Sequence, residues 1–197
     1  MATRMAEAEP AGAEARLQEL EARAHRRVQR AHAIAELDAL FRAGSAPDPL
    51  PIGFQPGRLL TMSVTPAIDA LVRRIADAWM PWKGKAFDPS TMTGINIMTA
   101  DARAPLRLLF GERPEPGPDG RMEVFPFRNR IAPGAVDPAV TTLKIDYDFP
   151  ANVDFIRRIL DELVQIGDGV YLGKILFRTR SGFHPIGFFS LQNPTQP

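Results

Sequence analysis

Residues 161–192 constrain the fold of this chain more than any other stretch. They contain two apolar runs rich in aromatic and β-branched residues, 170–177 and 186–191, with the turn Arg180-Ser181-Gly182 between them. Two such runs joined by a Gly-containing loop are the sequence pattern of a β-hairpin. The pattern predicts that the C-terminal part of the chain forms paired antiparallel strands.

Alternation with a period of two extends this prediction to the middle of the chain. Residues 121–131 and 141–149 alternate apolar with charged side chains, which is typical of antiparallel strands with one buried and one wet face. Short strands are also predicted at 59–64, 93–99 and 106–110. About seven or eight short strands separated by turns indicate a barrel or a sandwich, and glycines within the strands favour a barrel. We therefore predict a mainly β fold of the α+β type, built as an antiparallel barrel.

The N-terminal part of the chain has a different pattern. Residues 1–12 are small and polar, and we expect a disordered tail there. From 13 to 43 apolar residues recur three or four apart, which predicts one amphipathic helix that ends near Gly44. Because its apolar stripe is thin in the first half, we expect the second half to dock and the first half to project or to pair with another subunit. The chain is thus divided into a tail and helical arm, 1–45, and a barrel domain, 46–197.

Two helices are predicted inside the barrel domain. Thr65-Pro66 has the residue types of a helix N-cap and first turn, and the helical pattern continues to Trp79. A short amphipathic helix is predicted around residues 154–160.

Composition and charge exclude several classes of function. The 197 residues carry 24 Lys and Arg against 23 Asp and Glu, so nothing demands nucleic acid or an anionic membrane as a partner. There is no cysteine, which excludes disulfides and thiolate sites, and no apolar run long enough to span a membrane. The first residues lack the apolar segment of a signal peptide, so we expect a cytoplasmic protein. The arginines at 23, 26, 27 and 30 fit either a nucleic-acid patch or, preferably, a solvated helix face.

Short motifs in the barrel domain resemble those of a known class of proteins. They are Trp82-Lys-Gly-Lys85, Gly94-Ile-Asn96, Asp146-Tyr147, Asp161-Glu162 and Gly169-Val-Tyr-Leu-Gly173. With these elements the stretch 59–192 resembles the small calycin or lipocalin-like barrels, including bacterial and fungal proteins of unassigned function. The resemblance implies an up-and-down barrel whose interior takes a hydrophobic or amphipathic small molecule, and it gives no catalytic residues to carry over.

Five residues are candidates for ligand binding: Trp82, Lys85, Asn96, Tyr147 and Tyr171. Trp82 and Lys85 combine an aromatic face with a cation, which suits a carboxylate or phosphate headgroup; alternatively Trp82 closes the barrel floor and Lys85 lies in solvent. Asn96 faces either solvent or the interior. By alternation Tyr147 points inward between the outward Asp146 and Asp148, and Tyr171 is interpreted as inward too.

Other ionisable residues have two interpretations each. Asp146 and Asp148 form either an acid–base pair or ion site, or a solvated outer face. Asp161 and Glu162, expected at a helix end, form either a general base or a water-facing pair beside an arginine. His184 fits a metal or acid–base site less well than a surface loop. Because metal, phosphate-loop, serine-hydrolase and dinucleotide motifs are missing from the sequence, no cofactor or metal is predicted.

Three functions follow from this pattern. The first is binding of a hydrophobic small molecule in the barrel, with Lys85, Asn96, Tyr147 or Tyr171 holding its polar end. The second is an isomerase, lyase or cyclase of the same fold that moves a proton. The third is an interaction protein that forms a homodimer through the N-terminal helix. An apolar interior without ionisable groups would favour the first, a buried carboxylate beside a tyrosine the second, and a detached helical arm the third.

Overall fold

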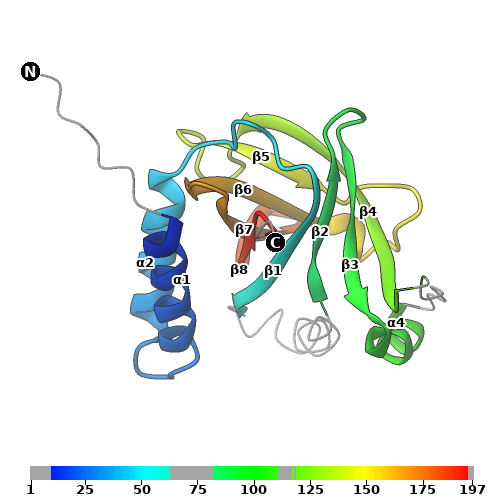
Figure 1. The fold of residues 1–197 in the computed structure, drawn as a ribbon, viewed down its shortest axis with the longest axis horizontal. Coiled ribbons are helices and arrows are strands. Elements are labelled where there is room, and N and C mark those ends of the chain that lie inside the picture. Colours follow the sequence, from blue (N-terminus) through cyan, green and yellow to red (C-terminus); the bar gives the residue numbers. More distant parts are fainter. Residues whose placement is uncertain (1–9, 63–81, 111–116, 118, 195–197) are drawn as a thin grey trace, which may run out of the picture.

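Eight strands close into an antiparallel β-barrel in the part of the chain that the structure describes (Figure 1). The structure is a computed structural model, and it describes residues 10–62, 82–110, 117 and 119–194. Each strand pairs with the next along the chain, and β8 pairs with β1. The strands are β1 Gly53–Met62, β2 Trp82–Asp88, β3 Thr93–Thr99, β4 Arg121–Pro133, β5 Thr141–Asp146, β6 Ile159–Gly167, β7 Val170–Thr179 and β8 Gly182–Gln192. The predicted mainly β barrel is therefore confirmed.

Alternating side chains give the barrel two separate apolar cores. Along β6, Ile159 and Leu163 belong to a core inside the barrel, whereas Val164 belongs to a core on its outer face. The same alternation places Leu143 and Ile145 of β5 inside. In a closed barrel, side chains along each strand point alternately to the interior and to the outer face. The inward side chains form the first core, and outward side chains contribute to the second.

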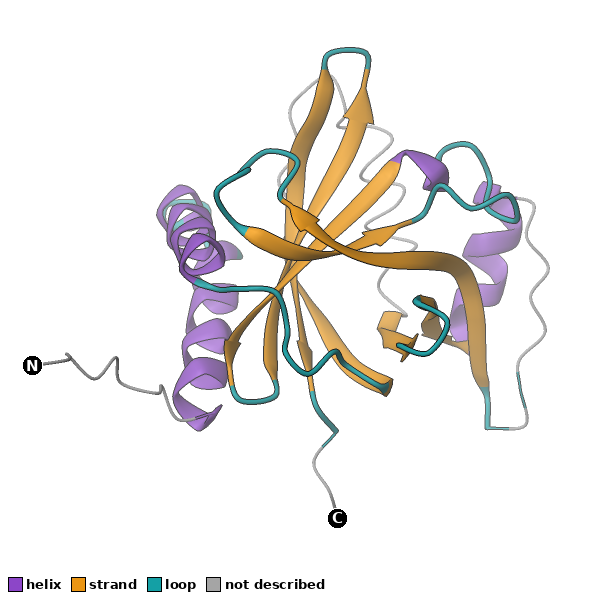
Figure 2. Cartoon of the chain, turned by 90° about the horizontal axis from the view of Figure 1, so that it is seen from above, coloured by secondary structure: helices purple, strands orange, loops and turns teal. Residues whose placement is uncertain are grey.

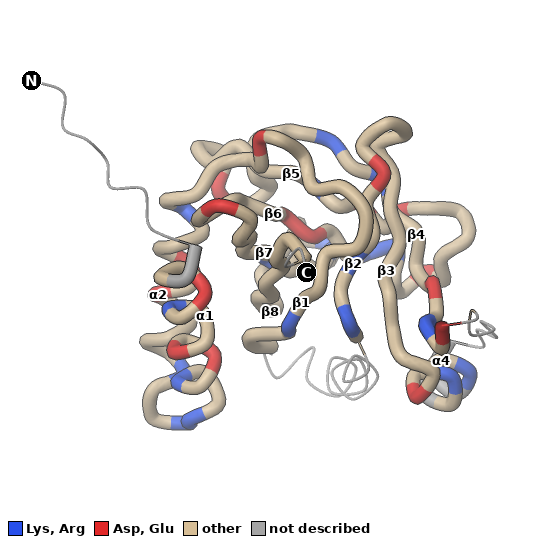
Figure 3. Tube along the Cα trace, in the orientation of Figure 1, with Lys and Arg blue, Asp and Glu red and all other residues tan. Residues whose placement is uncertain are grey.

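A helical hairpin covers part of the outer face (Figure 2). It consists of α1, Pro10–Ala24, and α2, Arg30–Ala43, which lie side by side against the barrel. Leu17, Leu37 and Phe41 are fully buried in the outer core with Leu172 and Phe188 of the barrel. Figure 3 shows that charges of both signs are mixed along the two helices.

The single helix predicted for residues 13–43 is wrong, because the chain turns at 25–29 and folds back. Val28 would have continued the apolar stripe of one long helix, but it lies in the turn and is 91% exposed. Folding back buries Leu17 and Leu20 against the molecule, and burial of an apolar face outweighs the continuation of a helix. The first half of the arm therefore does not project.

Two further predictions of local structure differ from the structure. Residues 106–110, expected as a strand, belong to the helix α4, Arg103–Phe110, which follows the short 3₁₀ helix η1, Ala100–Ala102. The helix expected at 154–160 is only the 3₁₀ turn η2, Ile156–Arg158, and β6 begins directly after it. Short apolar runs do not distinguish strand from helix by periodicity.

The strand expected at 59–64 is observed as β1, Gly53–Met62, which begins earlier. The helix expected from Thr65 to Trp79 lies outside the described residues. None of the helices in the described part of the chain is both long and apolar enough to cross a lipid bilayer.

At one end of the barrel, η1 and α4 follow directly after β3 (Figure 1). Ala102 of η1 and Leu106 of α4 are fully buried in the interior core, next to Met98 and Met122. The methionines are register partners on β3 and β4. The interior at this end is thus filled by flexible apolar side chains below a helix.

We predict that Gly173→Ala destabilises the barrel by about 1–3 kcal/mol, the range typical of overpacking. A Cβ at position 173 would lie 2.1 Å from the ring of Phe189, which is itself buried. Gly12→Ala is the control, because no atom lies within 4 Å of its Cβ position and alanine favours a helix. Urea unfolding of the two variants measures the difference. Equal stabilities would contradict the close packing of Gly173 on Phe189.

Candidate polar site inside the barrel

A fully buried ion pair crosses the interior of the barrel. Nζ of Lys85, on β2, lies 2.9 Å from Oδ2 of Asp161, on β6, and neither side chain is exposed. Strands β2 and β6 are not neighbours in the closed sheet. The contact therefore spans the interior and does not run along the wall.

Two further polar side chains complete this cluster. The hydroxyl of Tyr147, directly after β5, contacts Lys85 Nζ and lies 3.2 Å from Asp161 Oδ2. Asn96, on β3, accepts a hydrogen bond from Lys85 Nζ at 3.0 Å and donates one to the Tyr147 hydroxyl at 2.9 Å. We call Lys85, Asn96, Tyr147 and Asp161 the polar cluster.

Aromatic rings surround the ammonium group of Lys85. Its Nζ lies between 5.0 and 5.6 Å from four ring centroids, those of Trp82, Phe127, Tyr147 and Phe189. Trp82 also donates a hydrogen bond from Nε1 to Asn96 Oδ1 at 3.1 Å. Such rings attract a cation through their negative faces while they exclude water from it.

Irregularities in two strands aim the polar groups inward. The register of β2 on β3 shifts between Trp82 and Gly84, so both Trp82 and Lys85 reach the interior. Gly84 has a φ of 146°, and a Cβ there would lie 2.0 Å from the carbonyl oxygen of Gln55. In β4, Phe125 has a φ of 54°, and its carbonyl oxygen accepts a hydrogen bond from Asn96 Nδ2 at 3.2 Å. Bulges of this kind commonly redirect side chains at sites.

Burial shifts the proton affinity of each ionisable member of the cluster. Desolvation raises the pKa of Asp161, although the Lys85 ammonium opposes the shift. Desolvation likewise lowers the pKa of Lys85 against the attraction of Asp161. The pKa of Tyr147 is raised well above its usual value by burial and by the Asp161 carboxylate. Burial thus disfavours the charged form of each group, and each group in turn stabilises the charge of the other.

The structure brings together four of the five residues that the sequence singled out. Trp82, Lys85, Asn96 and Tyr147 meet in the interior, and Lys85 does not lie in solvent as one alternative had it. Tyr171 is also buried, but its hydroxyl donates to Asn193 Oδ1 at 3.1 Å, away from the cluster. The inward orientation of Tyr147 is confirmed, whereas a ligand-binding role for these residues stays a prediction.

Asp161 is the member of the cluster whose place the sequence did not indicate. It was expected with Glu162 at a helix end, either as a general base or as a pair that faces water or an arginine. Both residues instead lie within β6 and are fully buried. Glu162 points to the outer face, where Lys144 Nζ lies 2.6 Å from its Oε1. The available signal in the sequence was the apolar run that follows the two residues, because a strand that contains this run can begin before Asp161.

The remaining ionisable candidates lie outside the cluster. Asp146 pairs with Arg130 and Asp148 with Arg157, on the solvated side. His184 is exposed and contacts Ser181 Oγ through Nε2 at 2.9 Å. Among the described residues, no group of three or more His, Asp and Glu side chains is arranged to hold a metal ion.

On the outer face, a second buried cation fastens the helical hairpin to the barrel. Lys174 of β7 is almost fully buried, and its Nζ lies 2.7 Å from Asp38 of α2 and 2.5 Å from Asp137. Arg42 contacts the same two carboxylates. Burial alone would raise the pKa of Asp137, but hydrogen bonds from Lys174 and Arg42 outweigh it and hold the pKa low. Each of the two cations contacts both carboxylates, and this network attaches α2 to the barrel.

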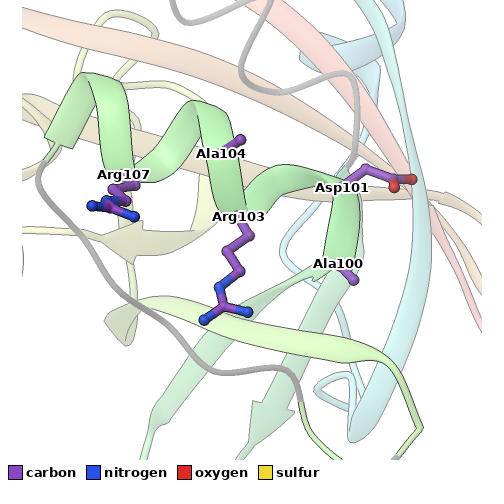
Figure 4. A pocket seen from close by; sticks show the side chains of 5 residues that line it. All are labelled: Ala100, Asp101, Arg103, Ala104 and Arg107. Atoms are coloured by element: carbon purple, nitrogen blue, oxygen red, sulfur yellow. The ribbon is translucent and has the colours of Figure 1, made fainter.

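A surface pocket of about 610 Å³ lies beside η1 and α4. Its described lining consists of Ala100, Asp101, Arg103, Ala104 and Arg107 (Figure 4). Arg103 and Arg107 extend from the same side of the helix, away from Asp101. No member of the polar cluster is among these lining residues, so the pocket and the cluster are separate features of the described chain.

Comparison with known proteins adds one observation. No family model matches the chain, and no curated protein sequence matches it. Among solved structures, the chain is similar to a protein from Thermomonospora curvata at 16% identity, with a TM-score of 0.49, over 89% of this chain and 99% of that one. The chemistry of the site therefore rests on its own geometry.

We predict that Lys85→Met destabilises the protein by about 3–5 kcal/mol, because it leaves Asp161 buried without a countercharge. Adding Asp161→Asn to the same chain should restore most of the loss, since neither charge then remains. Lys83→Met is the matched control on the same strand; Lys83 is exposed, so its change should stay within about 0.5 kcal/mol. Urea unfolding measures all three. A double variant as unstable as Lys85→Met would contradict a compensated pair.

Proposed function

We propose that the barrel, of the calycin type, binds a small hydrophobic or amphipathic molecule in its interior, with the polar cluster at the molecule's polar end. The observation that carries this proposal is the fully buried cluster of Lys85, Asn96, Tyr147 and Asp161 inside a largely apolar core. Sites for small molecules are mostly apolar cavities with a few convergent polar groups. We propose a cytoplasmic setting, which fits a chain without cysteine.

The energetics of the ion pair support a role beyond stability. A buried pair loses the hydration of two charges, and apolar side chains of similar volume often serve stability equally well or better. The Lys85–Asp161 pair lies where Phe127 and Phe189 already supply apolar packing. An ion pair in this apolar interior is therefore better explained by ligand recognition than by stability.

The side chains next to the cluster are suited to accommodate a ligand. Met98 and Met122 fill the interior toward α4, and methionine has several easily exchanged conformations. Trp82, Phe127 and Tyr171 would form apolar walls around the body of the molecule. We propose that a ligand enters by displacing the methionine pair.

An assembly role through the N-terminal helices has less support. The helices pack on their own barrel, and Leu17, Leu20 and Leu37 are fully buried there. A homodimer through this arm would have to use its charged outer side. We therefore keep the interior of the barrel as the functional site.

The proposal predicts a co-purifying molecule. Native mass spectrometry of the protein purified from its own host should show a mass above that of the polypeptide, and denaturation should release the difference. Tyr147→Phe removes one hydroxyl from the cluster and should lower the occupied fraction, whereas the exposed Lys83→Met should retain it. A polypeptide mass alone for the unaltered protein, under conditions that keep it folded, would count against ligand binding.

A specific observation also favours an enzyme that transfers a proton. The buried Asp161 carboxylate lies 3.2 Å from the Tyr147 hydroxyl, and its pKa is raised, as suits a general base or acid. A buried carboxylate beside a tyrosine was the feature expected to favour an isomerase, lyase or cyclase over a ligand-binding barrel, and Asp161 beside Tyr147 has this arrangement. In this second candidate function Asp161 would accept a proton from a carbon of the bound molecule and return it to another position.

Exchange in heavy water separates the two candidates. If Asp161 transfers protons, the released molecule, incubated with fresh protein in D₂O, should gain deuterium at carbon, as detected by mass spectrometry. Asp161→Asn should abolish this incorporation even at concentrations of the molecule high enough to saturate the variant. Incorporation at the rate of the protein-free control would leave the barrel as a carrier.

A further inference from the structure

The hydrogen bonds of the polar cluster limit what kind of chemical group it can bind. A buried lysine in a barrel suggests at first an anionic partner, such as a carboxylate or a phosphate. Whether Lys85 can serve an anion depends on which of its protons are already used. The same count can be made for each donor and acceptor of the cluster.

Lys85 has no proton left for a ligand. An ammonium group carries three N–H bonds, and three oxygens surround this one: Asn96 Oδ1 at 3.0 Å, Asp161 Oδ2 at 2.9 Å and the Tyr147 hydroxyl. The carboxylate of Asp161, 2.9 Å from Nζ, balances the charge of the ammonium group. With a proton transferred to Asp161, Lys85 would still direct its two remaining N–H bonds to the other two oxygens, so no donor would become free.

The neutral donors are used as well. The two N–H bonds of the Asn96 amide point to the Phe125 carbonyl oxygen at 3.2 Å and to the Tyr147 hydroxyl at 2.9 Å. The single hydroxyl proton of Tyr147 lies between Asn96 Oδ1 and Asp161 Oδ2, each 3.2 Å away. Trp82 gives its N–H to Asn96 Oδ1.

One acceptor remains open. Asp161 Oδ1 is buried and has no hydrogen-bond partner among the described residues. Oδ2 of the same carboxylate is bound by both Lys85 and Tyr147. Buried carboxylate oxygens are nearly always matched with donors, so this atom marks the place where a donor is missing.

We infer that the group which reaches the cluster is a neutral hydrogen-bond donor, a hydroxyl or an N–H, and that carboxylates and phosphates are rejected. An anion would find no free donor within the polar cluster and would add a second negative charge beside Asp161 in a desolvated interior. A cationic amine would lie beside the Lys85 ammonium. This inference rests on the proposed function, because it specifies the ligand for the same interior site.

Ligands that differ only in their polar end test the inference. The probes are 1-decanol, decanoate and decyl methyl ether, with 2-naphthol, 2-naphthoate and 2-methoxynaphthalene as a second set. Binding to the full chain at neutral pH is measured by isothermal titration calorimetry. In at least one set, the hydroxyl compound should bind about ten-fold or more tightly than its ether and its carboxylate, as one hydrogen bond to a charged group implies.

Each other result has a distinct meaning. A carboxylate that binds as tightly as its alcohol overturns the inference but leaves the ligand-binding function standing. An ether equal to the alcohol also overturns it, since the donor would then play no part. If none of the six compounds binds, the proposed function itself fails.

Two variants connect the preference to the cluster. Asp161→Asn removes the open carboxylate oxygen and leaves Lys85 without its countercharge, so preference should shift from the alcohol to the carboxylate. Tyr147→Phe frees one N–H of Lys85 and one of Asn96, and should raise the affinity for the carboxylate even if Asp161→Asn does not fold. Circular dichroism confirms folding of each variant. An unchanged preference in a folded variant places binding outside the cluster and overturns the inference.

Discussion

The contact between Lys85 and Asp161 fixes the interior of the barrel, because it joins two strands that the sheet itself keeps apart. Because both groups are desolvated, loss of either one would leave the other as an unpaired buried charge and would lower the stability of the fold. Asn96 and Tyr147 are held by the same two groups, and Trp82 is held by Asn96. The direction of five side chains thus depends on one ion pair.

The molecule uses buried cations in two different ways. Lys174, on the outer face, is enclosed by carboxylates of α2 and of the loop before β5, and Arg42 completes a network that joins helix to sheet. Among the residues that the structure describes, Lys85 faces one carboxylate and four aromatic rings in the interior. The cation on the outer face is paired with two carboxylates. The carboxylate of the interior pair keeps one oxygen, Asp161 Oδ1, without a hydrogen-bond partner among the described residues. Only the interior pair has the character of a recognition site.

Local patterns predicted the walls of the barrel and several inward side chains, but not what those side chains meet. Alternation indicated that Tyr147 points inward, and it limited Asn96 to two directions. The pairing of Lys85 with Asp161 depends on closure of the sheet, and no local pattern contains that information. The apolar run at α4 was mistaken for a strand because its helical form serves to bury Leu106 in the end of the barrel. The turn at residues 25–29 likewise depends on the surface onto which the helices pack.

Closure by β8 against β1 also affects the order in which the molecule can fold. The N-terminal hairpin and β1 are synthesised first, yet their partners include Val170, Leu172 and Phe188 near the other end of the chain. Contacts between residues so distant in sequence slow folding, because a long loop must close before they form. The apolar faces of α1, α2 and β1 therefore remain uncovered on the ribosome until the last strands emerge. During this interval they are natural substrates for chaperones.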